Sequence, residues 1–336
     1  MTPTQTTEPA APTIDYASPL AKTDRRVLIR QIWDSAGMLL LFALLFGACA
    51  LFVPNFLSVN NMTGLALSVT TVGMIACTML FCLAAGDFDL SVGSVLAMAG
   101  IVCVTVVNAS DSILLGIAAG VLAGGVVGLF NGVVIAQLGV NALIATLATM
   151  QIVRGLCFII SGGSAIGVSN TRFYELGNSS LILPTPVWIM IGCFAVFGIL
   201  LHQTTFGRNT LAIGGNRDAA RLAGISVTRT KIIIFTLQGL IAGLAGVIEA
   251  SQLTSGQPNS GTGLELRVIS ACVLGGVSLT GGVGTILSVI VGALLMGTVQ
   301  NAMDLKNVPT FYQYVASGGI LLGAVLLDRL KQRRSV

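Results

Sequence analysis

The sequence predicts an all-α, polytopic membrane protein with about ten transmembrane helices and both termini in the cytoplasm. Apolar residues make up 54% of the 336 residues and charged residues only 9%, which excludes an ordinary soluble domain. Apolar segments close to the ~20 residues that cross a bilayer recur along the whole chain. Lys and Arg gather in a few segments, and this asymmetry sets the orientation in the membrane.

The apolar segments define a central transmembrane domain, 36–330, between two polar tails. The tail 1–35 contains four prolines and lacks the short apolar core of a signal peptide, so it is expected to be a disordered cytoplasmic segment. A basic cytoplasmic tail, 331–336, ends the chain. The third, sixth and last three spans are short, so some of them are expected to be broken or tilted. In order, the predicted spans are 36–53, 62–84, 92–107, 113–136, 142–160, 186–201, 232–252, 267–280, 283–300 and 312–327.

The orientation follows from the positions of the 17 Lys and Arg residues. With ten spans, only Arg172 and Lys306 fall in segments that are clearly outside. One span more or fewer would place a basic terminus outside, so the positive-inside rule favours ten. The residues expected inside are Lys22, Arg25, Arg26 and Arg30 in the first tail, Arg208, Arg217, Arg221, Arg229 and Lys231 in the loop 202–231, and Arg329, Lys331, Arg333 and Arg334 at the end of the chain.

The loop 202–231 is the most informative polar segment between two spans. Asn216 is suited to cap a short helix, Asp218 favours the positive end of that helix, and Gly224 permits a left-handed ending. A rigid helix on a basic loop is what a membrane protein needs to pass force to a soluble partner. The residues assigned to this coupling segment are Asn216, Arg217, Asp218, Ala219, Ala220, Arg221 and Gly224.

Glycines at every fourth position mark one face of the fourth span. Such a face allows another helix backbone to approach closely, so it predicts helix packing. A sliding or gating surface is the alternative. Gly239 and Gly243 repeat the pattern in the seventh span. The packing glycines are Gly116, Gly120, Gly124, Gly128 and Gly132.

Two glycine-rich segments, 86–94 and 275–284, interrupt the apolar pattern. Irregular backbone at membrane depth is tolerated only where protein or a water-filled cavity satisfies it, and paired breaks often mark a transport pathway. Asp87 and Asp89 in the first break are therefore candidate pathway or gate residues. The alternative is that both segments are plain cytoplasmic turns, in which Asp89 caps the next helix.

A few polar residues lie within or beside other spans, where charge is costly and usually faces a cavity or a partner. They are interpreted either as the lining of a path for a hydroxyl-rich solute or as groups that bond one helix to another, with Arg154 alternatively extending its charge to the outer membrane surface. Arg267 is a further charge beside a span, without an assigned role. The candidates are Asn141, Thr149, Gln151, Arg154 and Glu249.

No catalytic or nucleotide-binding motif is apparent. The four lysines do not follow a G-x-x-x-x-G loop, no His/Cys cluster suggests a metal site, and no basic-aromatic surface suggests nucleic acid. The chain is therefore expected to be a transport protein that is not an enzyme and binds no cofactor of its own. If ATP drives it, ATP and Mg belong to a separate ATPase; an ion-coupled secondary transporter is the alternative.

The loop resembles the EAA loop of permease subunits of bacterial ABC importers. Asp218-Ala219-Ala220, Gly224 and Ile234 follow its spacing, with Asp in place of Glu. The stretches 86–94, 146–156, 206–216 and 269–284 are similar to the ribose/arabinose/xylose branch of sugar permeases. The resemblance implies an inner-membrane permease homodimer for a pentose, with L-arabinose the expected sugar. It further implies an ATP-binding subunit, a periplasmic sugar-binding protein and transport by alternating access.

Overall fold

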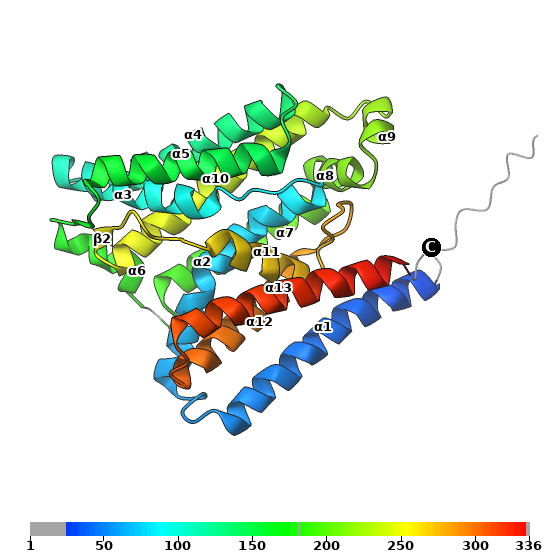
Figure 1. The fold of residues 1–336 in the computed structure, drawn as a ribbon, viewed down its shortest axis with the longest axis horizontal. Helices are drawn as coiled ribbons and strands as arrows, with labels where there is room; N and C mark the ends of the chain where they lie inside the picture. Colours follow the sequence, from blue (N-terminus) through cyan, green and yellow to red (C-terminus); the bar gives the residue numbers. More distant parts are fainter. Residues whose placement is uncertain (1–24, 181, 334–336) are drawn as a thin grey trace, which may run out of the picture.

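The computed structural model describes residues 25–180 and 182–333, and it is almost entirely helical (Figure 1). Seven of the described helices are long and apolar enough to cross a membrane, which establishes a polytopic all-α membrane protein. They are α2 (Val59–Ala84), α3 (Val92–Ser110), α4 (Ile113–Ala136), α5 (Ala142–Ser161), α7 (Thr185–Gln203), α10 (Val227–Gln252) and α12 (Ile286–Leu305).

Three further helices overlap the remaining predicted spans. α1 (Arg25–Phe52) and α13 (Thr310–Arg333) contain shorter apolar parts, Gly37–Phe52 and Thr310–Leu326, and α11 (Leu264–Gly275) has 12 residues. The count of ten spans therefore stays a prediction. α1 and α13 extend into the segments expected as tails, and the rest of those tails, 1–24 and 334–336, lies outside the described residues.

Polar side chains begin many of the helices. Each caps its helix by accepting a hydrogen bond from a backbone N–H two or three residues later, which satisfies an amide that the helix itself leaves free. These caps fix where the apolar segments begin. The capping residues are Ser58 for α2, Ser112 for α4, Asn141 for α5, Thr204 for α8 (Thr205–Gly215), Asn216 for α9 (Arg217–Leu222) and Thr285 for α12.

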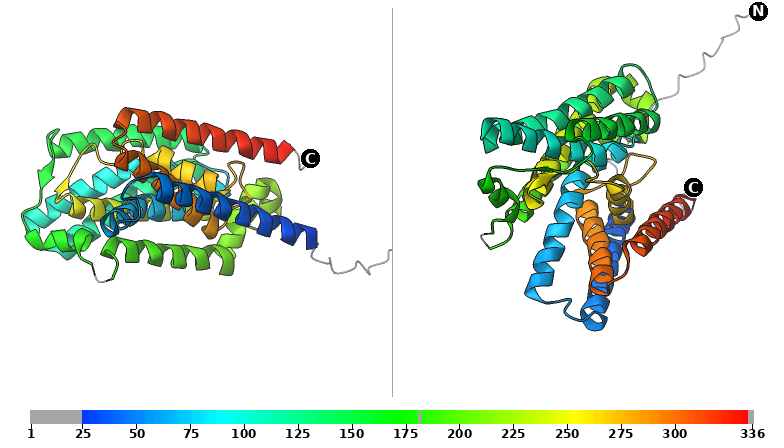
Figure 2. Two further views of the ribbon diagram at one scale, coloured as in Figure 1. Left: turned by 90° about the horizontal axis from the view of Figure 1, so that it is seen from below. Right: turned by 60° about the vertical axis from the view of Figure 1, so that its left-hand side comes forward.

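α2 is the central helix of the fold. It lies between a group formed by α3, α4, α5 and α10 and a second group formed by α1, α12 and α13, as the views of Figures 1 and 2 both show. Every residue of α2 from Gly73 to Ala84 is buried. A helix that is apolar on all sides and enclosed by other helices needs no polar face, which explains why the sequence of α2 shows little amphipathic pattern.

The glycine stripe of α4 lies against α10 and α3. A Cβ atom at Gly124 or Gly128 would overlap a backbone carbonyl oxygen of α10, that of Gly239 or Phe235 respectively. The other three glycines of the stripe face backbone or side-chain atoms of α3 and α10 in the same way: Gly116, Gly120 and Gly132. The structure thus places these glycines where two helix backbones meet, which is the packing arrangement that small residues permit in membranes.

The two ends of the molecule differ. At one end, β1 (Ile166–Gly167) pairs antiparallel with β2 (Ser255–Gly256), beside the 3-10 helix η1 (Thr171–Phe173) and α6 (Tyr174–Asn178). At the other end lie α8 and α9, together with the start of α1 and the end of α13 (Figure 1).

We expect Gly128→Val to destabilise the helix bundle. A Cβ bearing two methyl groups would be forced into the backbone of α10, and overpacking of this kind costs about 1–3 kcal/mol. Thermal unfolding of the detergent-solubilised protein measures the effect. Gly155→Ala on α5 is the control, because nothing lies within 4 Å of an added Cβ there; an equal loss in both variants would contradict a packing role for the stripe.

Candidate functional site

The short helix predicted in the loop 202–231 is present as α9. The side chain of Asn216 accepts hydrogen bonds from the amides of Asp218 (3.1 Å) and Ala219 (2.9 Å). Gly224 has φ = +83°, and the next amide, of Ile225, donates to the carbonyl of Ala220 at 3.0 Å. A cap at one end and a left-handed glycine at the other make α9 a defined unit although it is short.

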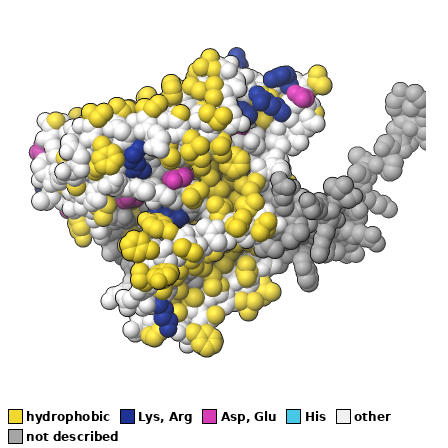
Figure 3. All heavy atoms as spheres, viewed as in Figure 1, with side chains coloured by type: hydrophobic (Ala, Val, Ile, Leu, Met, Phe, Trp, Pro, Cys, Tyr) yellow, Lys and Arg dark blue, Asp and Glu magenta, His cyan; other side chains and the backbone are white. Residues whose placement is uncertain are grey.

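α9 has one face toward the protein and one toward its surroundings. Ala220 is buried in a small cluster with Ile213 of α8 and Val227 of α10. Leu222 is 90% exposed, and the charged side chains of α9 are exposed beside it. Figure 3 shows basic side chains gathered at the place that α9 occupies in Figure 1. An exposed leucine within a basic surface suits contact with a protein partner.

The two glycine-rich breaks meet at the C-terminal end of α2, close to α8. The amide of Gly282 donates to the carbonyl of Ala84 at 2.9 Å. The backbone of Gly214, near the end of α8, lies so close to Ala84 at the end of α2 and to Gly282 in the second break that a side chain there would overlap them. Gly86, Gly281 and Gly282 all have positive φ, a conformation that favours glycine. Two segments far apart in sequence thus form one junction at the base of the coupling loop.

Asp87 in the first break forms an ion pair with Lys231 in the first turns of α10. The Lys231 Nζ–Asp87 Oδ2 distance is 2.6 Å, and both side chains are nearly buried. Removing one partner of such a pair leaves an uncompensated charge in a low-dielectric interior, which is strongly unfavourable. The pair therefore fastens the break after α2 to the segment of α10 that follows the coupling helix.

Asp89 starts a chain of hydrogen bonds that joins three helices. Its Oδ1 accepts from the amide (2.8 Å) and hydroxyl (2.6 Å) of Ser91, just before α3. Asn131 of α4 donates to the Ser91 hydroxyl, and Thr149 of α5 donates to Asn131. Burial raises the pKa of the Asp89 carboxyl, and the bonds from Ser91 partly oppose that rise. Asp89 and Thr149 thus have partners within the subunit.

The other polar residues of the fifth predicted span lie apart from any common site. Asn141 caps α5, and Gln151 is exposed on that helix. Arg154 donates from Nη1 to the backbone carbonyls of Pro258 (2.5 Å) and Ser260 (2.7 Å), in the loop after β2. The structure thus gives Asn141 and Arg154 bonding partners within the chain.

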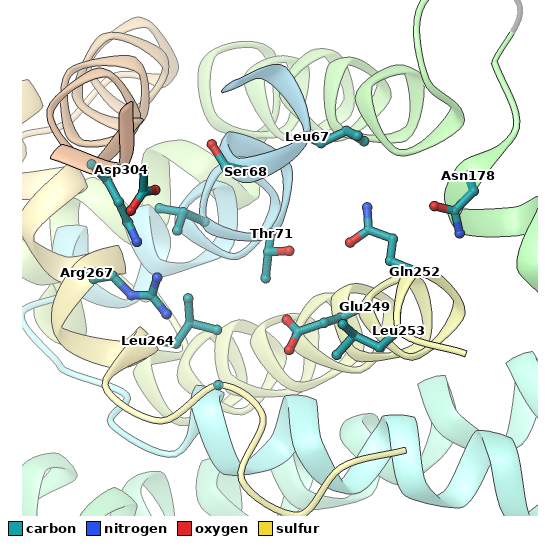
Figure 4. Close-up of a pocket in the computed structure, with 13 residues that line it drawn as sticks. Leu67, Ser68, Thr71, Asn178, Glu249, Gln252, Leu253, Leu264, Arg267 and Asp304 are labelled. Carbon is teal, nitrogen blue, oxygen red and sulfur yellow. The ribbon is translucent and has the colours of Figure 1, made fainter. Parts of the chain in front are cut away.

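A polar cavity of about 450 Å³ lies at the end opposite α9 (Figure 4). Glu249, one of the residues predicted from the sequence, lies on its wall. Three charged residues, Glu249, Arg267 and Asp304, and several amides and hydroxyls converge on this space from α2, α6, α10, α11 and α12. Its polar lining residues are Ser68, Thr71, Asn178, Glu249, Gln252, Arg267, Gln300 and Asp304.

The lining of this cavity matches a small, hydroxyl-rich solute. Carboxylates accept hydrogen bonds, a guanidinium donates them, and amides do both, so together they suit hydroxyl groups that also do both. The volume lies within the range of about 300–1,000 Å³ common for small-molecule sites. The sequence pointed only to Glu249, because the other polar residues come from five separate elements and converge only in the fold.

A multi-helix membrane protein with a polar cavity at one end and a capped, exposed helix at the other has the parts of a transport permease. Residues 61–325 match the family described as branched-chain amino acid transport system / permease component. The chain belongs to this permease family.

The relatives at the sequence level are sugar permeases. The chain is 59% identical to the L-arabinose transport system permease protein AraH of Escherichia coli K12, over 90% of the chain and 93% of AraH. It is 52% identical to the L-arabinose ABC transporter permease protein AraH of Azospirillum brasilense, over 91% of each. It is 38% identical to the ribose import permease protein RbsC of E. coli K12, over 83% of the chain and 88% of RbsC. No solved structure matches.

We expect Lys231→Met to destabilise the protein by about 3–5 kcal/mol, because it leaves the Asp87 carboxylate buried and unpaired. The double variant Asp87→Asn/Lys231→Met should recover most of that loss, since both charges are then removed. Thermal unfolding of all four members of this double-mutant cycle measures the coupling. Arg229→Met, at an exposed position two residues earlier, should change stability by less than about 0.5 kcal/mol. Additive single effects would contradict the ion pair.

Proposed function

We propose that the chain is the membrane permease subunit of an ATP-driven importer that carries a pentose, L-arabinose, across the bacterial inner membrane. The observation that supports this most strongly is the identity of 59% and 52% to two L-arabinose permeases over nine-tenths of the chain, compared with 38% to a ribose permease. The polar cavity lined by Glu249 and Arg267 supplies a place for the sugar.

The proposed topology has ten spans with both termini in the cytoplasm. It is supported by the common position of the start of α1, the end of α13 and the basic helices α8 and α9 at one end of the molecule (Figure 1). With that end in the cytoplasm, 36–330 forms the transmembrane domain and the cavity opens toward the periplasm. This assignment satisfies the positive-inside rule.

Each end of the molecule, the α9 end and the cavity end, has a proposed partner. An ATP-binding subunit docks on α9 and uses ATP and Mg, while the permease itself binds no cofactor. A periplasmic sugar-binding protein delivers sugar at the cavity, and the permease functions as a homodimer. The segment from Asn216 to Gly224 then passes the motion of the ATPase to α10, which begins three residues after Gly224. Transport is by alternating access.

An ion-coupled transporter without an ATPase is not favoured. Two of the carboxylates that an ion path could use are engaged within the subunit, Asp87 by Lys231 and Asp89 by Ser91. One relative is named a transport system permease protein and another an ABC transporter permease protein.

Reconstitution tests the proposed function. The permease is co-expressed with the ATP-binding subunit and the sugar-binding protein of an L-arabinose importer, and the complex is placed in proteoliposomes. We expect uptake of radiolabelled L-arabinose that requires ATP inside the vesicles, with ribose and xylose as the comparison sugars. Uptake that proceeds without ATP, or that is lost when an ion gradient is dissipated, would reject an ATP-driven importer.

Leu222→Glu should uncouple the permease from its ATPase. The side chain is 90% exposed and contributes nothing to the buried cluster around Ala220, so the fold should be unaffected while an apolar docking contact is lost. Co-purification of the ATPase and ATP-dependent uptake are the measurements. Thr228→Glu adds the same charge at an exposed position in the first turn of α10 and should behave as wild type. Equal behaviour of the two variants would remove α9 as the docking element.

A further inference from the structure

One side of the molecule leaves two membrane helices largely uncovered. α5 and α13 lie on this side with α11 between them, and α7 lies on the opposite side, as Figures 1 and 2 both show. In the proposed topology this side lies within the membrane, between the two ends where the ATP-binding subunit and the sugar-binding protein dock. Neither of those partners therefore covers it. We call it the α5–α13 face.

α5 presents one row of side chains on this face. Leu147, Gln151, Arg154 and Phe158 follow one another at intervals of four, three and four residues, so they lie along one side of the helix. Arg154 donates to carbonyls of the loop that leads into α11, so this row faces the same side as α11. Leu147, Gln151 and Phe158 are exposed, and Arg154 is half-buried. This spacing is that of a seam on which another helix packs.

The middle of this row is polar at membrane depth. At 1.5 Å per residue, Gln151 lies about 14 Å from the start of a helix about 30 Å long. Its side chain makes no hydrogen bond within the described part of the chain. Polar groups are costliest at the middle of a bilayer and face protein or water there, not lipid. The α5–α13 face therefore needs a cover that lipid does not supply.

This face carries charges of both signs. Glu265, in the first turn of α11, is half-buried like Arg154 and has the opposite charge. Figure 3 shows basic and acidic side chains together between α5 and α13. A two-fold axis brings a surface patch against its own copy, so a patch with both charges complements itself.

α13 carries a row with the same spacing. Phe311, Val315, Gly318 and Leu322 are all exposed, the three large side chains to 79%, 74% and 61%. Nothing lies within 4 Å of a Cβ atom added at Gly318, whereas Gly124 of α4 meets the backbone of α10. Glycine is less stable than alanine inside a helix, and in membranes it serves close approach of another helix. No helix of this subunit makes that approach at Gly318.

The two rows match in depth and in shape. Under the proposed topology α5 ends and α13 begins at the outer end. At 1.5 Å per residue, Arg154 and Gln151 lie about 11 Å and 15 Å before the end of α5, and Gly318 lies about 12 Å after the start of α13. The long side chains of one row are thus level with the gap in the other.

We infer that a second copy of this chain covers the α5–α13 face, with α5 of each copy packed antiparallel against α13 of the other. The inference rests on the proposed homodimer and names its interface. Two-fold symmetry makes the same contact twice, so each copy places Gln151 and Arg154 over Gly318 of its partner. The polar middle of α5 is then enclosed between the copies, away from lipid.

Cross-linking tests the contact. In a permease without its seven native cysteines, two copies with different tags are co-expressed, one with Gln151→Cys and one with Gly318→Cys. A short bifunctional maleimide applied to membranes should join the two tags in one dimer band. Gly192→Cys in place of Gly318→Cys is the matched control and should give no such band. Gly192 is also exposed, with nothing within 4 Å of an added Cβ, but it lies on α7.

Substitution provides a second, independent measurement. Gly318→Leu fills the gap that the partner's α5 needs, so it should raise the Kd of the purified dimer at least about tenfold. Gly192→Leu should leave that Kd unchanged. Neither glycine has a neighbour within the described subunit, so both variants should elute as folded protein. Light scattering across a dilution series in detergent gives the Kd.

The outcomes separate this inference from the proposed function. A wild-type permease that is monomeric in membranes overturns both the proposed homodimer and this interface. If wild type is dimeric, the interface alone is overturned by three results: no 151–318 band, a band of equal strength with Gly192→Cys, or an unchanged Kd in Gly318→Leu. ATP-dependent uptake of L-arabinose by the wild-type complex is measured separately and is unaffected by any of these three results.

Discussion

Direct contact between helix backbones, made possible by glycine, is the constraint on which the rest of this structure depends. Lipid is as apolar as a leucine side chain, so burial of apolar surface does not hold membrane helices together, and close packing must do so. Gly124 and Gly239 bring α4 onto α10, Gly100 and Gly246 bring α3 onto α10, and Gly275 and Gly292 bring α11 onto α12. At each crossing even one added carbon atom has no room.

These crossings define α10 as the element that joins the two functional ends. Its glycines at 239, 243 and 246 hold it against α4 and α3 over the middle of its length. Its first turns carry Lys231, close to the coupling helix, and its last turns carry Glu249 on the cavity wall. A helix clamped in this way moves as a rigid body, so a displacement at one end reaches the other without being absorbed by side-chain rearrangement.

The features that the sequence predicted correctly are the local ones. Asn216 as a cap, Gly224 as a left-handed ending and a helix between them depend on neighbours within a few residues, and the structure contains all three. The apolar segments were likewise predicted correctly as helices, because a membrane helix makes its backbone hydrogen bonds within its own segment. The boundaries were less accurate where apolar composition fades, as at the start of α1.

The cavity and the buried pair could not be predicted in this way. Arg267, Gln300 and Asp304 come from different helices, and nothing in the sequence near any of them indicates that they share a space. Lys231 counts toward the positive charge of the loop 202–231, yet the fold buries it against Asp87, 144 positions earlier. The sequence makes Arg154 a candidate pathway residue, but it gives no sign that the guanidinium donates to two carbonyls in the loop after β2.

The ion pair between Asp87 and Lys231 has an energetic consequence. An ion pair in a low-dielectric interior resists separation more strongly than an apolar contact of the same size, because each charge loses its partner before it gains water. Lys231 lies one turn after Val227, and Val227 packs directly on Ala220 of α9. A force applied at α9 is therefore transmitted to the Asp87–Lys231 ion pair through one turn of α10. An end held shut by such a pair opens only when the two charges are separated, so α9 is the element through which a force from outside the subunit can reach that pair.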